Sequence, residues 1–139
     1  MTTPSVKKPL PVPQPESDRY WAGALAGELW LRRCLDCKQT YFYPRNICPL
    51  CGSANVEWFM ASGRATLYTF AIAHRAPHPG FEGDVPFITA IVELAEGPRM
   101  ATNIVGVAPD PANLHIGMAL RAVFEKATDQ IALPKFTPA

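Results

Sequence analysis

The sequence predicts a mainly β protein, in which a short N-terminal helix and a rubredoxin-like zinc ribbon precede a five-stranded OB-fold barrel. Three observations support this fold class: four cysteines in two tight pairs, β-type segments throughout the second half, and 15 prolines gathered at the two ends and in one loop. With 139 residues, the chain has the length of one domain plus a small metal-held appendage.

The first segment, residues 1–16, is predicted to be an extended or disordered arm. Five prolines fall within its first 15 residues, and its apolar residues follow no helix or strand period. Two roles stay open for such an arm: a solvated tail, or a strap laid across a partner.

A short helix is expected next, over residues 17–28. Ser17 or Asp18 is placed to cap its start, and Gly27 is placed to end it. Spacings of three and four residues put one apolar set on a single helical face: Tyr20, Trp21, Ala24 and Leu25.

Residues 29–57 contain all four cysteines, paired as Cys34 with Cys37 and Cys48 with Cys51. Two residues separate the members of each pair, and ten separate the pairs. This spacing lets one tight turn aim two thiolates at one ion, and two such turns complete a tetrahedral shell without water. The pattern predicts a structural zinc ribbon, whose metal stabilises the fold and has no catalytic role.

Other interpretations of the cysteines fit parts of the pattern. Structural disulfides need an oxidising compartment, and the first residues carry no apolar stretch typical of a secretory signal. A thioredoxin-like dithiol needs one pair beside a βαβ pattern, which the sequence lacks. Iron in a rubredoxin-like shell stays open, because four thiolates suit either metal. We therefore expect a cytoplasmic protein that binds zinc.

Residues 58–139 are predicted to form the barrel. Segments rich in Thr, Tyr, Phe and Ile are separated by turns, and Asp110 is placed to cap one helical turn at Pro111. The expected strands are residues 65–74, 86–94, 99–107, 119–126 and 131–139. Five strands, with a helical turn before a late strand, favour the OB-fold.

Several short motifs appear in the order typical of a known family. They include Arg33-Cys34 through Cys37, Cys48-Pro49-Leu50-Cys51-Gly52, His78-Pro79-Gly80-Phe81, Gly97-Pro98-Arg99 and Pro134-Lys135-Phe136. On these motifs, the chain after the arm resembles the small zinc-ribbon plus OB-fold proteins formerly called domain of unknown function 35 (DUF35) and described as acyl-CoA-associated. One departure is Ala65, where members often have a glycine.

The resemblance implies a partner protein. Members look like companions of thiolase-superfamily enzymes, in which the thiolase-like chain carries the nucleophilic cysteine and the ribbon–OB chain helps to shape the path of the acyl-CoA. We therefore expect an accessory subunit without independent activity. The sequence agrees, because a metal would occupy every thiol, and neither a Gly-x-Ser-x-Gly elbow nor a glycine-rich phosphate loop is present.

The loop over residues 74–86 is the candidate acyl-CoA site, because loops at barrel mouths commonly bind ligands. Local hydrogen bonding is the alternative role for its histidines, and a solvated surface charge is the alternative for the arginines. The candidates for holding the pantetheine arm or phosphates are His74, Arg75, His78, Phe81, Phe87 and Arg64, with Arg99 as a further phosphate candidate.

Aromatic residues around the helix and ribbon are the candidate partner interface. Trp and Tyr are enriched in interfaces, and a small ribbon has little room to bury many rings. The alternative is that these rings build the core of the ribbon itself. The candidates are Tyr20, Trp21, Leu25, Trp30, Tyr41 and Tyr43.

The charge balance argues against nucleic-acid binding. Thirteen Lys and Arg face twelve Asp and Glu, and the net charge of +1 forms no basic run. A nucleic-acid-binding protein is nevertheless the alternative function, because ribbons and OB-folds both serve it and exposed aromatics can stack on bases. No stretch has the eighteen or more apolar residues of a membrane span, so a membrane role is not expected.

Overall fold

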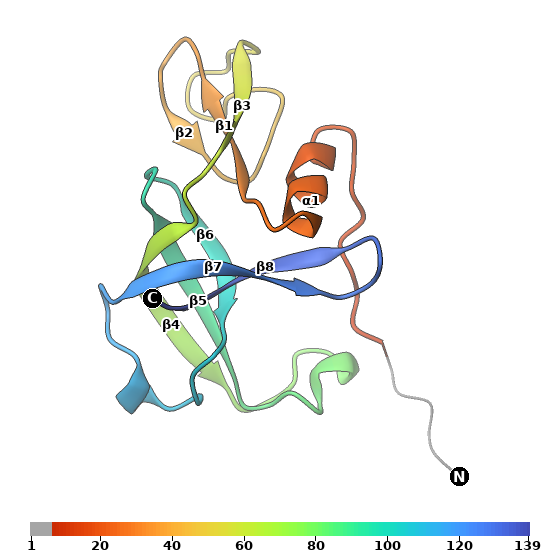
Figure 1. Ribbon diagram of the computed structural model, residues 1–139, viewed down its shortest axis with the longest axis vertical. Helices are drawn as coiled ribbons and strands as arrows, with labels where there is room; N and C mark the ends of the chain where they lie inside the picture. Colours follow the sequence, from red (N-terminus) through yellow and green to blue (C-terminus); the bar gives the residue numbers. More distant parts are fainter. Residues whose placement is uncertain (1–6) are drawn as a thin grey trace.

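The computed structural model describes residues 7–139, so the first six residues of the predicted arm lie outside the described part. The described chain forms a small three-stranded sheet above a barrel, with one helix beside the junction (Figure 1). Its elements are α1 (Asp18–Leu25), β1 (Trp30–Cys34), β2 (Thr40–Tyr41), β3 (Val56–Met60), β4 (Arg64–Ala73), β5 (Phe87–Leu94), β6 (Arg99–Ile104), β7 (Ala119–Lys126), β8 (Ala132–Pro138), and the 3₁₀ turns η1 (Pro79–Phe81) and η2 (Pro111–Asn113).

Helix α1 begins after Ser17 and ends close to the predicted glycine. The Ser17 hydroxyl makes no bond to the helix; it donates to the carbonyl of Gln14 at 3.3 Å and accepts from the Gln14 N–H at 3.1 Å. Ser17 therefore stabilises the preceding turn instead of capping the helix. Gly27 adopts φ +80°, a conformation that glycine takes without steric cost and that directs the chain towards β1.

The ribbon sheet has the strand order β2-β1-β3, and both pairings are antiparallel. Only Thr40 and Tyr41 form β2, so the first hairpin of the ribbon is short. In contrast, β3 pairs with β1 along its full length, from Cys34 with Val56 to Trp30 with Met60. The ribbon sheet thus ends at Met60, and β4 begins at Arg64.

The second sheet closes into the predicted five-stranded barrel, in the order β4-β5-β6-β8-β7. β4 pairs with β5 and β7, and β6 meets β8 in parallel at Ile104 and Phe136. A bulge between Leu67 and Thr69 bends β4, as bulges do where a sheet curls. Before β7, the Asp110 carboxylate accepts from the N–H of Ala112 at 2.8 Å, which confirms the predicted capped turn.

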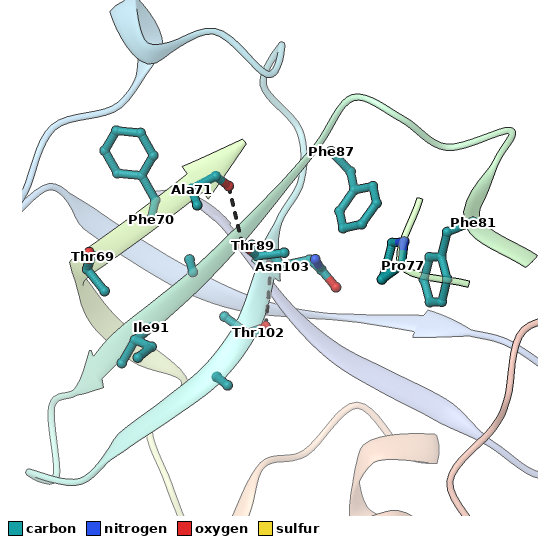
Figure 2. Close-up of a pocket in the computed structure, with 12 residues that line it drawn as sticks. Thr69, Phe70, Ala71, Pro77, Phe81, Phe87, Thr89, Ile91, Thr102 and Asn103 are labelled. Carbon is teal, nitrogen blue, oxygen red and sulfur yellow. Dashed lines mark hydrogen bonds between the residues drawn. The ribbon is translucent and has the colours of Figure 1, made fainter. Parts of the chain in front are cut away.

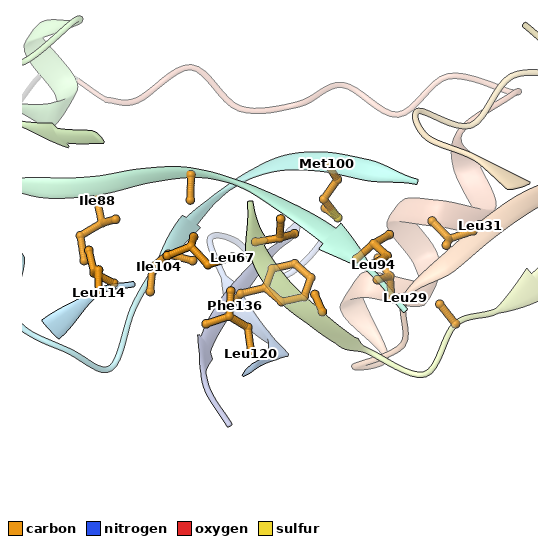
Figure 3. Packing of buried hydrophobic residues seen from close by; sticks show 14 of the residues in the cluster. Leu29, Leu31, Leu67, Ile88, Leu94, Met100, Ile104, Leu114, Leu120 and Phe136 are labelled. Carbon is orange, nitrogen blue, oxygen red and sulfur yellow. The ribbon is translucent and has the colours of Figure 1, made fainter. Parts of the chain in front are cut away.

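One hydrophobic core joins the barrel to the base of the ribbon. Phe136, Leu67 and Val92 are almost fully enclosed inside the barrel, and the same cluster includes Leu29 and Leu31 from the ribbon side. Figure 3 shows these two leucines continuing the row of barrel side chains beyond Leu94. Packing across the junction therefore fixes the two parts relative to each other.

Alanine substitutions at one buried and one exposed isoleucine test this assignment of the core. Ile104 is 4% exposed where β6 meets β8, whereas Ile116 is 61% exposed before β7. We expect Ile104→Ala to lower the free energy of unfolding by about 2–5 kcal/mol, because it leaves a cavity. Ile116→Ala is expected to change it by less than about 0.5 kcal/mol. Urea unfolding followed by circular dichroism measures both, and equal losses would contradict the assignment.

Candidate metal centre and barrel cleft

The four cysteines meet at one point at the tip of the ribbon. All four sulfur atoms lie within 4.8 Å of one another. The Cys34 and Cys51 sulfurs are 3.5 Å apart, and those of Cys37 and Cys48 are 3.7 Å apart. A tetrahedron of Zn–S bonds of about 2.3 Å requires sulfur separations of about 3.8 Å. The donor set and its dimensions therefore fit one structural zinc ion.

Two similar turns present the thiolates. In the first, the Cys37 N–H points at the Cys34 sulfur at 3.4 Å; in the second, the Leu50 N–H points at the Cys48 sulfur at 3.4 Å. The residues after each pair, Lys38 and Gly52, both have positive φ, at 65° and 80°. Each turn folds back sharply after its second cysteine, which brings both sulfurs of the pair to the same side.

Hydrogen bonds within the cluster shift the pKa values of Cys34 and Cys51 in opposite directions. The N–H of Cys37 lowers the pKa of Cys34 to about 7, although burial opposes this shift. For Cys51, the Ser53 N–H lowers the pKa, but the hydrogen bond with Cys34 and burial outweigh it and raise the value to about 12. Without a metal the cluster retains protons, so zinc binding must release them.

An aspartate within the first cysteine pair connects the two turns. The Asp36 carboxylate accepts from the hydroxyl of Ser53, and from the Asn55 side chain at 3.2 Å. The hydrogen bond from Ser53 is the larger cause, and the one from Asn55 the smaller, that lowers the pKa of Asp36 below its ordinary value. These positioning residues were not predicted from the sequence, although the polar run after the second cysteine pair was a usable signal.

An open cleft of about 620 Å³ lies on the outer face of β4, β5 and β6. Figure 2 shows Phe81 and Phe87 at one end, near Pro77. Their ring centroids are 5.7 Å apart with planes at 34°. The remaining lining residues come from the strands and are small, polar or apolar: Thr69, Phe70, Ala71, Thr89, Ala90, Ile91, Ala101, Thr102 and Asn103.

The structure brings together only part of the predicted acyl-CoA set. Phe81 and Phe87 line the cleft, whereas His74, Arg75 and His78 do not. His78 accepts from the N–H of Gly80 at 2.9 Å, so its imidazole caps η1 locally.

The other two arginine candidates lie elsewhere on the barrel. Arg64 lines a separate hollow at the start of β4, and Arg99 pairs with Glu93 at 3.2 Å and stacks 3.9 Å from the Tyr68 ring centroid. The strand residues of the cleft were not predicted, because the alternation of apolar and polar residues does not show which outward face of a sheet is hollow.

The predicted interface residues divide into buried and surface groups. Tyr20 and Tyr41 are 3% and 4% exposed, so their rings pack in the interior of the protein and cannot form a contact surface. The Trp21 indole donates to the Tyr43 hydroxyl at 2.9 Å, joining α1 to the ribbon.

Leu25 and Trp30 reach the surface. Leu25 is 41% exposed, and half-buried Trp30 lies beneath the guanidinium of Arg19, whose central carbon is 3.8 Å from the ring centroid. Leu25 is thus the exposed candidate of the six, whereas Trp30, like Trp21 and Tyr43, is half-buried.

The described residues thus define a class of protein: a four-thiolate ribbon fused to a closed OB-fold barrel. Two family models cover this architecture, "ChsH2, rubredoxin-like zinc ribbon domain" over residues 21–57 and "ChsH2, C-terminal OB-fold domain" over residues 58–125. A "DUF35 domain-containing scaffold protein" of Methanocaldococcus jannaschii is 39% identical over 95 residues, 68% of this chain and 65% of that protein. The chain belongs to the DUF35 family, as the resemblance predicted.

Two further relatives carry names that involve enzymes. A "Probable enoyl-CoA hydratase alpha subunit" of Thermomonospora curvata is 36% identical over 136 residues, 98% of this chain but 41% of that protein. This chain therefore spans less than half of that relative. The solved structure "Ltp2-ChsH2(DUF35) aldolase" contains a chain with a TM-score of 0.79 and 35% identity, covering 93% of this chain and 98% of that one.

Metal content tests the thiolate site. We expect one zinc ion per chain, and we expect Cys51→Ser to lose it under mild chelation because three thiolates leave the shell open. Ser53→Ala removes the hydrogen bond to Asp36 and the one that the Ser53 hydroxyl accepts from the Asn55 N–H, but no thiolate, and should keep the metal. Elemental analysis of the purified proteins measures both, and full zinc retention by Cys51→Ser would contradict the assignment.

Proposed function

We propose that the chain is a non-catalytic subunit that binds a thiolase-superfamily enzyme and helps it to bind acyl-CoA in the cytoplasm. The observation that carries the proposal is the likeness of the whole described fold to the chain in the "Ltp2-ChsH2(DUF35) aldolase" structure. The match to a hydratase alpha subunit over 98% of this chain supports the same association with acyl-CoA enzymes.

The chemistry of the described residues supports an accessory role. All four thiols are committed to one metal-sized cluster, which leaves none as a nucleophile. The Nδ1 atom of His78 accepts a hydrogen bond from the backbone N–H of Gly80, so this nitrogen is not positioned to activate a hydroxyl or thiol. In residues 7–139 no helix is long and apolar enough to cross a membrane.

The surface around α1 supports partner binding. Leu25 is exposed at the end of the helix, and Met60, at the end of β3, is 55% exposed. Trp30 pairs with Met60 across β1 and β3 and carries the stacked Arg19. Tryptophan, methionine and arginine are the residue types enriched in interface cores.

The cleft supports acyl-CoA binding. Its volume suits a small organic ligand, and its aromatic end offers stacking surface to an extended pantetheine or acyl chain. The Asn103 side-chain nitrogen donates to the Ile88 carbonyl at 2.9 Å, so its side-chain oxygen is the atom that could accept a hydrogen bond from an amide N–H of the ligand. The ligand would therefore lie outside the barrel, against the sheet.

Affinity purification from the native host tests the function. We expect the tagged chain to recover a thiolase-like protein in stoichiometric amount, identified by mass spectrometry. Leu25→Asp is expected to lower the recovery at least tenfold, because it places a charge in the proposed contact. Ile116→Asp, at an exposed site before β7, is the control and should recover the partner fully.

Two results would contradict the proposal. Equal recovery of the partner by Leu25→Asp and Ile116→Asp would show that α1 is not part of the interface. Recovery of nucleic acid that dissociates as salt rises, in place of an enzyme, would favour the alternative function.

A further inference from the structure

Residues 7–16 lie along the molecule from η1 to the ribbon. In Figure 1 this segment leaves the start of α1 and runs down past the end of the β7–β8 hairpin towards the loop that carries η1. It holds four alternating prolines, Pro9, Pro11, Pro13 and Pro15. Proline favours extended chain of about 3.1 Å per residue, so the segment is stiff and spans the height of the barrel.

The lower end of the segment is held by side chains of the loop beside the cleft. The Lys8 ammonium forms an ion pair with the Asp84 carboxylate. It also lies 5.2 Å from the centroid of Phe81, within the range of a cation–π contact. Phe81 is the aromatic wall of the cleft, so one lysine connects the segment to that wall.

Backbone contact at Gly80 is closer still. A Cβ placed on Gly80 would lie 2.8 Å from the nitrogen of Lys8 and 2.9 Å from its Cα, both of them backbone atoms. Gly80 does not have a positive φ, so glycine is needed here for the contact and not for the conformation. Gly83, three residues on, has nothing within 4 Å of such an atom.

The upper end of the segment is attached to the ribbon. The Glu16 carboxylate accepts from the Arg45 guanidinium at 2.7 Å and from the backbone N–H of Asn46 at 3.4 Å. The hydrogen bond from Arg45 lowers the pKa of Glu16 below its ordinary value, although burial opposes the shift. Both ends of the segment are thus fixed, one to the ribbon and one to η1.

We propose that residues 7–16 are an internal strap that holds η1, and with it the Phe81 wall, closed against the cleft. Release of the strap opens the cleft at its aromatic end, and a partner or ligand that displaces the strap gains access there. The claim that release of the strap admits acyl-CoA rests on the proposed function. The claim that the strap holds Phe81 in place does not.

Two alanine substitutions in the same loop test the strap. In the full-length, zinc-loaded chain, Gly80→Ala is expected to push away the Lys8 backbone and to speed amide hydrogen exchange of residues 80–84 about tenfold. Gly83→Ala introduces the same methyl group into open space and should exchange like the parent. Near-ultraviolet circular dichroism and zinc content confirm that both variants are folded.

Reversing the charge of Lys8 provides a second test, and this substitution adds no bulk to the loop. Lys8→Glu places two negative charges together and is expected to speed exchange of the same amides about two- to threefold, in keeping with an exposed ion pair. The double variant Lys8→Glu/Asp84→Lys restores opposite charges and should return the rate towards that of the parent.

Two outcomes would overturn the strap. The first is that Gly80→Ala and Gly83→Ala exchange alike; the second is that Lys8→Glu and the double variant exchange alike. Because these measurements use neither partner nor acyl-CoA, their failure leaves the purification result unaffected, and failure of the purification leaves them unaffected.

Discussion

Convergence of four thiolates on one ion is the constraint on which the rest of the structure depends. The interior of the ribbon tip contains little besides Cys34, Tyr41 and Cys48, with Cys37 and Val56 against them. So few apolar side chains cannot offset the entropy of ordering two turns, and a metal supplies what a small core lacks. The bond between Asp36 and Ser53 then fixes one turn against the other.

The metal has consequences beyond the ribbon because β1 leads directly into the shared core. Cys34 ends β1, and Leu31 lies three residues earlier, fully enclosed against barrel side chains. The surface around Leu25 and Trp30 and the cleft with Phe81 and Phe87 are therefore parts of one connected body. Such a body suits a subunit that contacts an enzyme at one place and a substrate at another.

The sequence predicted those features that depend on local chemistry. The spacing of Cys34, Cys37, Cys48 and Cys51 predicted the thiolate cluster, and Asp110 before Pro111 predicted the capped turn. Features set by contacts distant in sequence were not predicted: the enclosure of Tyr20 and the closeness of Lys8 to Gly80. For the cleft, Phe81 was found because it lies in the predicted loop and Phe87 because it directly follows that loop, whereas Asn103 lies on a distant strand.

Nuclear magnetic resonance of the ¹⁵N-labelled protein before and after zinc removal tests most directly whether ribbon and barrel form one body. If they do, chelation should shift amide resonances of the ribbon and of the adjoining barrel residues Leu94 and Met100, which share the core with Leu29 and Leu31. Resonances at the far end, around Leu114, should change least. Shifts confined to residues 30–60, with Leu94 and Met100 unchanged, would contradict the account and show two independent modules.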